Sequence, residues 1–319
     1  MLHQFIALIV LTHFDRAQSS PGFNCVPTGT CQAQSGVTLN RRIFTRGNPC
    51  PTGELPCLPI QTSTTCGKRN VTAIQPHDGV ATHGAWPWAV YITNQTGFCG
   101  GGVLISPNTV LTAAHKVSGN RDTPNLIGVY VGVHSPKELG AKLNVSRVTV
   151  HPRFNMTNFF NDLAVLHLAT AVTPLPQQLV NLVCPPTAAM SFVGQTCTVA
   201  GWGQSSFTVH DAPIAQQKQV HVKIVDADTC YQSMSHQSLL GQNVNMYLDP
   251  IGEICAGGEG SRDSCTYDGG SPLVCYVNNA HYVLAGVVIW GKGCGQPGTY
   301  GVYTSIPNYA NWIQSVIAP

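Results

Sequence analysis

The sequence predicts an all-β fold for most of this 319-residue chain, preceded by a small segment that cannot build a core of its own. After about residue 80, short runs rich in β-branched and aromatic residues alternate with Gly, Pro and Asn, which is typical of strands joined by tight turns. Before residue 60, four cysteines stand in a stretch with frequent Gly and Pro and no helical period. The chain therefore divides into a disulfide-dependent part and a β-sheet part.

Residues 1–18 are interpreted as a signal peptide. An apolar run from Phe5 to Leu11 is followed by polar residues from Thr12. The run is too short to span a bilayer and fits the apolar region of a secretory leader. The alternative is a buried strand or helix of the mature fold. Because no later apolar run is long enough to span a membrane, we expect a secreted, extracellular protein.

The composition agrees with export. Only 9% of residues are charged and the net charge is +2, which argues against a general nucleic-acid binder because that function needs clustered Lys and Arg. Thirteen cysteines fit an oxidising compartment. Four N-glycosylation sequons make the protein a candidate glycoprotein; they begin at Asn70, Asn94, Asn144 and Asn155.

The segment 22–60 is too short to bury much apolar surface, so it requires disulfide bonds. Its cysteines allow three pairings, among which the sequence does not choose; they are Cys25, Cys31, Cys50 and Cys57. Residues 61–79 are interpreted as a linker containing Cys66, and residues 80–319 as the large β domain.

Within the large domain, four runs are the clearest strand candidates: Trp88–Ile92, Val110–Thr112, Ile127–Val131 and Val283–Trp290. One helix is expected near the C-terminus, from Asn308 to Val316. Its apolar side chains recur at helical spacing along one face: Tyr309, Trp312, Ile313 and Val316.

Several motifs then occur in a fixed order: Gly84-Ala-Trp-Pro-Trp88, Cys99-Gly-Gly-Gly, Val110-Leu-Thr-Ala-Ala-His115, Asn161-Asp162-Leu-Ala-Val-Leu, Ala200-Gly-Trp-Gly203, Asp263-Ser-Cys through Cys275, and Trp290-Gly-Lys-Gly-Cys294. This set resembles the chymotrypsin/trypsin (S1) family of serine proteases from residue 80 onward. The resemblance implies two packed six-stranded antiparallel β-barrels, with the site in the cleft between them.

The same resemblance assigns roles. His115 falls at the general base and Asp162 at the carboxylate that orients it. The nucleophile loop of the family reads Cys-x-Gly-Asp-Ser-Gly-Gly-Pro, whereas this chain has Gly269 at the serine position between Cys265 and Cys275. Since both cysteines keep their spacing, no gap shifts the register, and the chain is predicted to be a pseudoprotease rather than an enzyme.

Three neighbours of Gly269 bear on this prediction. Tyr267 replaces the glycine of the oxyanion hole, and Asp268 is the residue that pairs with a new N-terminal amine in activated members. Ser271 is the alternative nucleophile. It lies two residues downstream, where an extended chain places it up to about 7 Å away, beyond the hydrogen-bond reach that a nucleophile and its base need.

The primary specificity pocket is also implied by the resemblance. Asp263 falls at its base, where a carboxylate favours Arg or Lys, and Gly291 and Gly301 fall at its walls. Ile289 replaces a serine at the inner edge, which argues against substrate binding of the usual kind. The family is cut after a basic residue before an Ile or Val, but no basic residue directly precedes Ile74. The sequence does not decide whether cleavage at Arg46 or Arg69 is required.

The family pattern implies four bridges in this region: Cys66–Cys184, Cys197–Cys275, Cys230–Cys255 and Cys265–Cys294. Cys99 is the odd cysteine, because Lys116 stands where its usual partner follows the base histidine. It is expected either to be a free thiol or to bond another molecule. No tight Cys-x-x-Cys cluster suggests a metal, and no cofactor is expected.

The N-terminal segment resembles an arthropod clip domain through Cys25-Val-Pro-Thr-Gly-Thr-Cys31, Asn48-Pro-Cys50 and Leu55-Pro-Cys57, with four cysteines instead of six. Clip-bearing homologues with glycine at the serine position act as cofactors or regulators in innate-immune cascades of prophenoloxidase activation and melanisation. The resemblance therefore implies extracellular partners, either proteases or prophenoloxidase. The alternatives are a trypsin-like endopeptidase with residual activity and a decoy inhibitor of such a cascade.

Overall fold

The computed structural model describes residues 24–27, 54–57, 66–69, 71, 78–173, 179–203, 215–236, 238–260, 269–291 and 296–317. It separates the chain into two units, Met1–Gln61 and Thr62–Pro319. The signal peptide and Arg46 lie outside the described residues, as do the side chains of Cys25 and Cys57. The same holds for Cys31, Cys50, Asn70, Ile74, Asp263, Cys265, Tyr267, Asp268 and Cys294.

In the N-terminal unit the structure describes one antiparallel pair of strands. Strand β1 (Asn24–Pro27) pairs with β2 (Glu54–Cys57), and Cys25 lies opposite Pro56. The pairing brings together two segments that are far apart in the sequence of this unit. The assignment of the segment to the clip type stays a prediction.

The first barrel of the second unit is closed by six antiparallel strands. In barrel order they are β4 (Ala89–Asn94), β5 (Gly97–Ser106), β6 (Thr109–Thr112), β9 (Ala164–Leu168), β8 (Leu143–Val150) and β7 (Gly128–Val131). Three of the four apolar runs that predicted strands fall in β4, β6 and β7.

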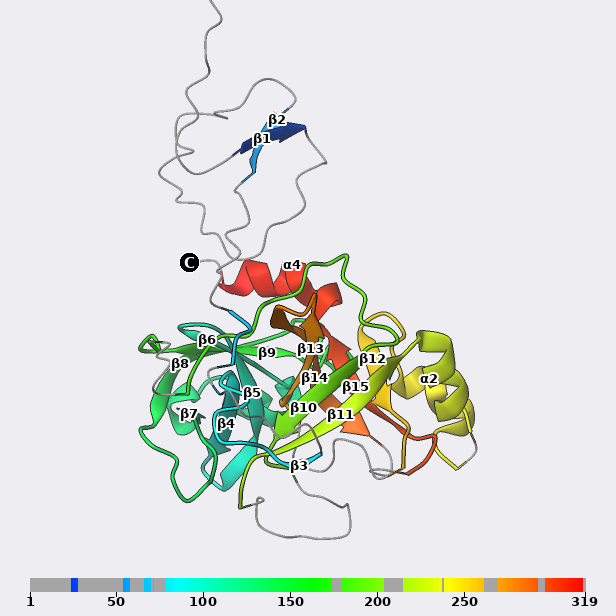
Figure 1. Ribbon diagram of the computed structural model, residues 1–319, viewed down its shortest axis with the longest axis horizontal. Coiled ribbons are helices and arrows are strands. Elements are labelled where there is room, and N and C mark those ends of the chain that lie inside the picture. Colours follow the sequence, from blue (N-terminus) through cyan, green and yellow to red (C-terminus); the bar gives the residue numbers. More distant parts are fainter. Residues whose placement is uncertain are drawn as a thin grey trace, which may run out of the picture. The chain divides into compact units, whose positions relative to one another are not determined.

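The second barrel also closes through six strands, because β10 pairs with β11 as well as with β13. Two-residue β3 (Gly79–Val80) adds to one end of β11. The order is β10 (Thr196–Gly201), β13 (Pro272–Val277), β14 (His281–Gly291), β15 (Tyr300–Ser305), β12 (Glu253–Gly257) and β11 (Lys218–Val225). The expected trypsin-like pair of barrels is confirmed, and Figure 1 shows them side by side.

Helices are few and short. The longest in the described part is α4 (Ile306–Ile317), which contains the predicted C-terminal helix. Its predicted face is the buried one, since Tyr309 and Ile313 lie in the core and Trp312 packs against it. The others are α1 (Ala114–Val117), α2 (Ala227–Met234) and α3 (Val244–Tyr247).

Each barrel has its own apolar core, and a third cluster joins the two. Val90, Leu104 and Leu166 belong to the core of the first barrel; Val222 and Leu273 belong to that of the second. The joining cluster takes side chains from both barrels, among them Trp88, Leu163, Trp202, Leu284 and Tyr309. Burial of such large side chains holds the barrels together and fixes how they meet.

Candidate functional site

His115 and Asp162 form a tightly hydrogen-bonded pair in the first barrel. His115 lies on α1, directly after β6, and Asp162 lies just before β9. The His115 backbone N–H donates to Asp162 Oδ1 over 2.8 Å, and Nδ1 of the ring lies 2.5 Å from Oδ2. Since a carboxylate can only accept, the pair holds the proton on Nδ1 and directs Nε2 away from Asp162.

Position 269 lies against the outward nitrogen of that histidine. A Cβ atom built on Gly269 would be 3.0 Å from His115 Nε2, so a side chain here would point at the base. The same Cβ would be 2.5 Å from Cε of Lys116, whose aliphatic chain also passes Gly100. The geometry brings His115, Asp162 and Gly269 together, while Lys116 fills part of the space that a side chain at 269 would take.

The backbone beside Gly269 makes a very close approach to the first barrel. The Gly101 N–H donates to the Gly269 carbonyl over 3.0 Å. Gly270 has φ +90°, and a Cβ on it would be 2.1 Å from the Gly101 carbonyl oxygen and 2.4 Å from Thr112 Oγ1. Only glycine fits this crossing, which is where the two barrels touch beside the site.

Ser271 is buried on the side of Gly101 rather than presented to the base. The residue is 1% exposed. A Cβ on Gly101 would be 2.3 Å from its Oγ. Among the described residues this hydroxyl has no hydrogen-bond partner, so it makes no bond to His115. The arrangement leaves Ser271 without the base contact that a nucleophile needs.

The expected walls of the pocket lie opposite each other. Gly291 of β14 pairs with Gly301 of β15, and a Cβ on Gly291 would be 3.7 Å from Gly301 Cα. Ile289 is 5% exposed and packs with Ala113 and Val302, so its side chain belongs to the core. Asp263 lies outside the described residues, and its place at the base of the pocket stays a proposal.

Phe159 is a neighbour of the site that sequence reasoning missed. Its ring meets the His115 ring edge to face at 5.2 Å between centroids, and its φ of +60° is unusual for an aromatic residue. Its only signal in the sequence is that it lies three residues before Asp162. The Phe159 ring therefore packs directly against the imidazole of His115.

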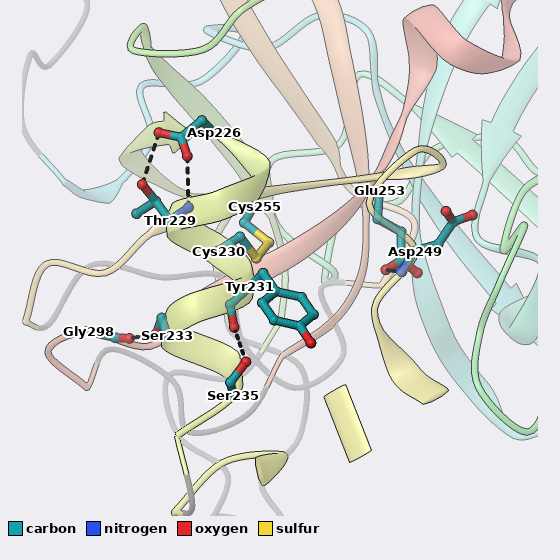
Figure 2. The surroundings of a disulfide bond; sticks show 10 residues. All are labelled: Asp226, Thr229, Cys230, Tyr231, Ser233, Ser235, Asp249, Glu253, Cys255 and Gly298. Carbon is teal, nitrogen blue, oxygen red and sulfur yellow. Dashed lines mark hydrogen bonds between the residues drawn. A yellow bond between two sulfur atoms is a disulfide. The ribbon is translucent and has the colours of Figure 1, made fainter. Parts of the chain in front are cut away.

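A second missed residue is a buried carboxyl at the start of β12, Glu253. It is 6% exposed, and its Oε2 accepts a hydrogen bond of 3.0 Å from the Asp249 backbone N–H (Figure 2). The pKa of Glu253 is raised to about 9, chiefly by burial and to a smaller extent by the charges of Asp249 and Asp162, against the lowering effect of the hydrogen bond from Asp249. The group is therefore neutral at physiological pH.

Three disulfides tie the described part of the second unit, and they are pairs that the resemblance implied: Cys66–Cys184, Cys197–Cys275 and Cys230–Cys255. The last joins α2 to β12 (Figure 2). The first attaches the chain before residue 70 to the barrel unit. The fourth implied bridge, Cys265–Cys294, lies outside the described residues.

Cys99 is an unbonded thiol within the described part of the chain. Its Sγ lies 3.5 Å from the Ile92 carbonyl oxygen, and burial raises the pKa of the thiol to about 11 despite the charge of Lys116. The thiolate is the reactive form, so burial disfavours reaction of Cys99 in the folded chain, and whether it bonds another molecule stays a prediction.

We expect Cys99 to react with iodoacetamide at pH 8 at least about tenfold more slowly in the native protein than in guanidinium, because almost no thiolate forms. Mass spectrometry of the Cys99 peptide over time measures both rates. Equal rates would show that the thiol is ionised and accessible in the folded chain.

Asn144 and Asn155 are exposed and Asn94 is half-buried, so three of the four sequons reach solvent. Within the described ranges, no three His, Cys, Asp or Glu side chains converge as a metal site. In the same ranges, no helix has the length and apolar character to cross a membrane.

Comparison with known proteins assigns the family. The family described as Trypsin matches residues 78–313. "Inactive CLIP domain-containing serine protease A3" of Aedes aegypti is 34% identical over 92% of this chain, which spans 66% of that protein. "Phenoloxidase-activating factor 2" of Galleria mellonella is 34% identical over 79% of the chain and 89% of its own length.

A relative whose name does not describe it as inactive has a similar sequence identity to this chain. "Tryptase" of Mus musculus is 35% identical over 75% of this chain and 87% of its own length. Similarity alone therefore does not separate working enzymes from homologues named inactive. Together, the two closed barrels, the His115–Asp162 pair and the match over residues 78–313 show that the chain belongs to the trypsin family.

Proposed function

We propose that this chain is a secreted, catalytically inactive member of its family that acts by binding other proteins in an extracellular protease cascade. The observation that carries the proposal is the glycine beside His115 Nε2. A trypsin-like mechanism needs a hydroxyl at that place to attack the carbonyl, and Gly269 has no side chain. In subtilisin, loss of the serine lowers kcat by on the order of 10⁶, roughly 8 kcal/mol of transition-state stabilisation.

Further observations support an inactive cleft. Ser271 is buried with its hydroxyl on the Gly101 side, which disfavours it as a substitute nucleophile. Lys116 occupies part of the space in front of Gly269, and the Phe159 ring packs against that of His115. Tyr267 in the oxyanion loop and Asp263 in the pocket belong to the same proposal as sequence-based assignments.

The cascade is proposed from the relatives. Two of them are named inactive CLIP-domain proteases and one a phenoloxidase-activating factor. We propose that this chain has a clip-like segment at residues 22–60. We also propose that it acts as a cofactor in prophenoloxidase activation and melanisation, with a cascade protease or prophenoloxidase as its partner. In this proposal the region around His115 keeps the arrangement of a protease site but binds a partner protein instead of cleaving a substrate.

Purified full-length protein is expected to show no hydrolysis of a small arginine ester above background, and no labelling by a serine-directed phosphonate. The matched variants are His115→Ala and Ser271→Ala, and neither should change the result. Hydrolysis that disappears in His115→Ala, or a phosphonate adduct on Ser271, would show instead a residual endopeptidase.

The cofactor role is tested separately by adding the protein to a reconstituted mixture of an active clip-domain protease and prophenoloxidase. A rise in phenoloxidase activity is expected. A fall would identify a decoy inhibitor, and no change over a tenfold range of concentration would count against both roles.

A further inference from the structure

The segment that leads into the barrel unit contains an arginine held between two aromatic rings. The Arg69 guanidinium carbon lies 4.7 Å from the ring centroid of Trp86 and 4.4 Å from that of Tyr282. The guanidinium also donates a hydrogen bond to the Tyr282 hydroxyl. The two rings stand edge to face at 5.4 Å, so together they form two walls of a cage.

The cage takes the arginine partly out of water. Burial lowers the pKa of Arg69 and raises that of Tyr282, as expected when charged forms lose their hydration. Stacking of a guanidinium on aromatic faces compensates for that loss, since the ring face carries negative electrostatic potential. Lys68, the neighbouring basic residue, is exposed and has no such cage.

The backbone on the N-terminal side of Arg69 is fixed as well. The Gly67 N–H donates to the Leu182 carbonyl over 2.7 Å, and the Tyr282 N–H donates to the Gly67 carbonyl over 2.8 Å. Asn181 Nδ2 donates to the Lys68 carbonyl over 2.9 Å. The approach is so close that a Cβ on Gly67, which has φ +67°, would lie 2.3 Å from the Tyr282 carbonyl oxygen.

Contacts also lie on both sides of the peptide bond that follows Arg69. On one side the Cys66–Cys184 disulfide anchors the segment, and on the other Val71 packs against the cluster that joins the barrels. A trypsin-like protease cuts after arginine when the side chain enters its own acidic pocket on an extended backbone. Arg69 cannot occupy that pocket and the cage at once.

We propose that the Trp86–Tyr282 cage guards the Arg69–Asn70 bond, so that a trypsin-like protease cuts there only after the cage has opened. Cutting adds one water across the bond and leaves a carboxylate on Arg69 and an amine on Asn70. Because Cys66 is bonded to Cys184, the N-terminal fragment would stay attached to the barrel unit. The basic pair before Asn70 is thus a protected sequence in the folded chain, in contrast to the exposed, flexible sites at which proteases usually cut.

The test is limited digestion of the full chain by trypsin, with mass spectrometry of the new N-terminus at position 70. Every protein carries Asn70→Gln so that a glycan cannot hinder the enzyme. For each protein, the rate of cutting in the native state is divided by the rate for the same chain after reduction and unfolding. This division cancels the preference of trypsin for Arg over Lys. We expect the native ratio to be below about one in a hundred, because cutting follows the small population of open molecules.

Two variants test whether the contacts of Arg69 with the Trp86–Tyr282 cage slow the cut. Arg69→Lys keeps a residue after which trypsin cuts but loses the planar guanidinium that stacks on both rings. Its ratio of native to unfolded cutting rate is therefore expected to rise about tenfold. Tyr282→Phe keeps the ring and removes only the hydroxyl, so its ratio should rise about threefold. A native ratio near one, or an Arg69→Lys ratio equal to that of the parent, would overturn the proposal. Thermal unfolding of each variant separates local opening of the cage from global destabilisation.

Discussion

Replacement of Gly270 by alanine is expected to lower the free energy of unfolding by about 4 kcal/mol, which combines strain at positive φ with overpacking. The new Cβ would lie 2.1 Å from the Gly101 carbonyl oxygen and 2.4 Å from Thr112 Oγ1. The first contact is with backbone, so no side-chain rotation relieves it. The barrels would have to separate locally beside His115.

Gly194→Ala is the matched control for this change. Gly194 has φ +81°, close to the +90° of Gly270, but a Cβ on it meets nothing within 4 Å. Its substitution is expected to lower stability by only about 1 kcal/mol, from backbone strain alone. Urea unfolding of both variants measures the difference. Equal losses would mean that the Gly101 carbonyl yields without cost and that the crossing of the two barrels is not tightly packed.

Glu253→Gln is expected to stabilise the protein at pH 8 by on the order of 3 kcal/mol, because the buried carboxyl must stay protonated to fold. Its pKa of about 9 in the folded state is above the ordinary value of 4.5. Between these values the unfolded chain loses the proton while the folded chain keeps it. Stability from this group is therefore present below about pH 4.5 and declines as the pH rises toward 9. Glutamine removes that decline and can still accept the hydrogen bond from Asp249.

The control removes the same charge from the surface. Glu138 is exposed, so Glu138→Gln should leave the dependence of stability on pH unchanged. Urea unfolding of the parent, Glu253→Gln and Glu138→Gln at pH 5, 6.5 and 8 gives the dependence of the free energy of unfolding on pH for each protein. If the parent protein and Glu253→Gln lose stability in parallel as the pH rises, Glu253 is ionised in the folded state and the expected stabilisation is wrong.

The fold could be predicted because its signals are local and ordered. The runs Trp88–Ile92 and Val110–Thr112 are short, apolar and bounded by turn residues, and both fall in strands of the first barrel. The helix around Tyr309 and Ile313 followed from spacing alone. How the strands close into barrels depends on pairings over long distances, and there the expectation came from the resemblance.

The site could be predicted only in part. The motifs gave His115, Asp162 and Gly269, which the structure brings together. Glu253 and Phe159 belong to no motif and were missed. The burial of Glu253 depends on packing around β12, and the conformation of Phe159 depends on its loop.

The cage around Arg69 was missed for a related reason. Tyr282 contributes one wall from more than two hundred positions along the chain, and no pattern in one sequence connects them. The sequence left open whether cleavage at Arg69 is required. Only the folded structure shows that the Arg69 side chain stacks on the rings of Trp86 and Tyr282.

The hydrogen bonds of Asp162 give its carboxylate a structural role that a chain without catalytic activity, as proposed here, would still need. Both of its oxygens accept bonds from His115, one of them from the backbone, and its own carbonyl accepts the Thr304 hydroxyl of the second barrel. Loss of the side chain would leave a polar group at the start of α1 without its partner, whatever the state of the reaction. Asp162 therefore contributes to the fold independently of any reaction. A serine that contacts only substrate and base has no such protection, so mutation can remove the activity while the rest of the triad persists.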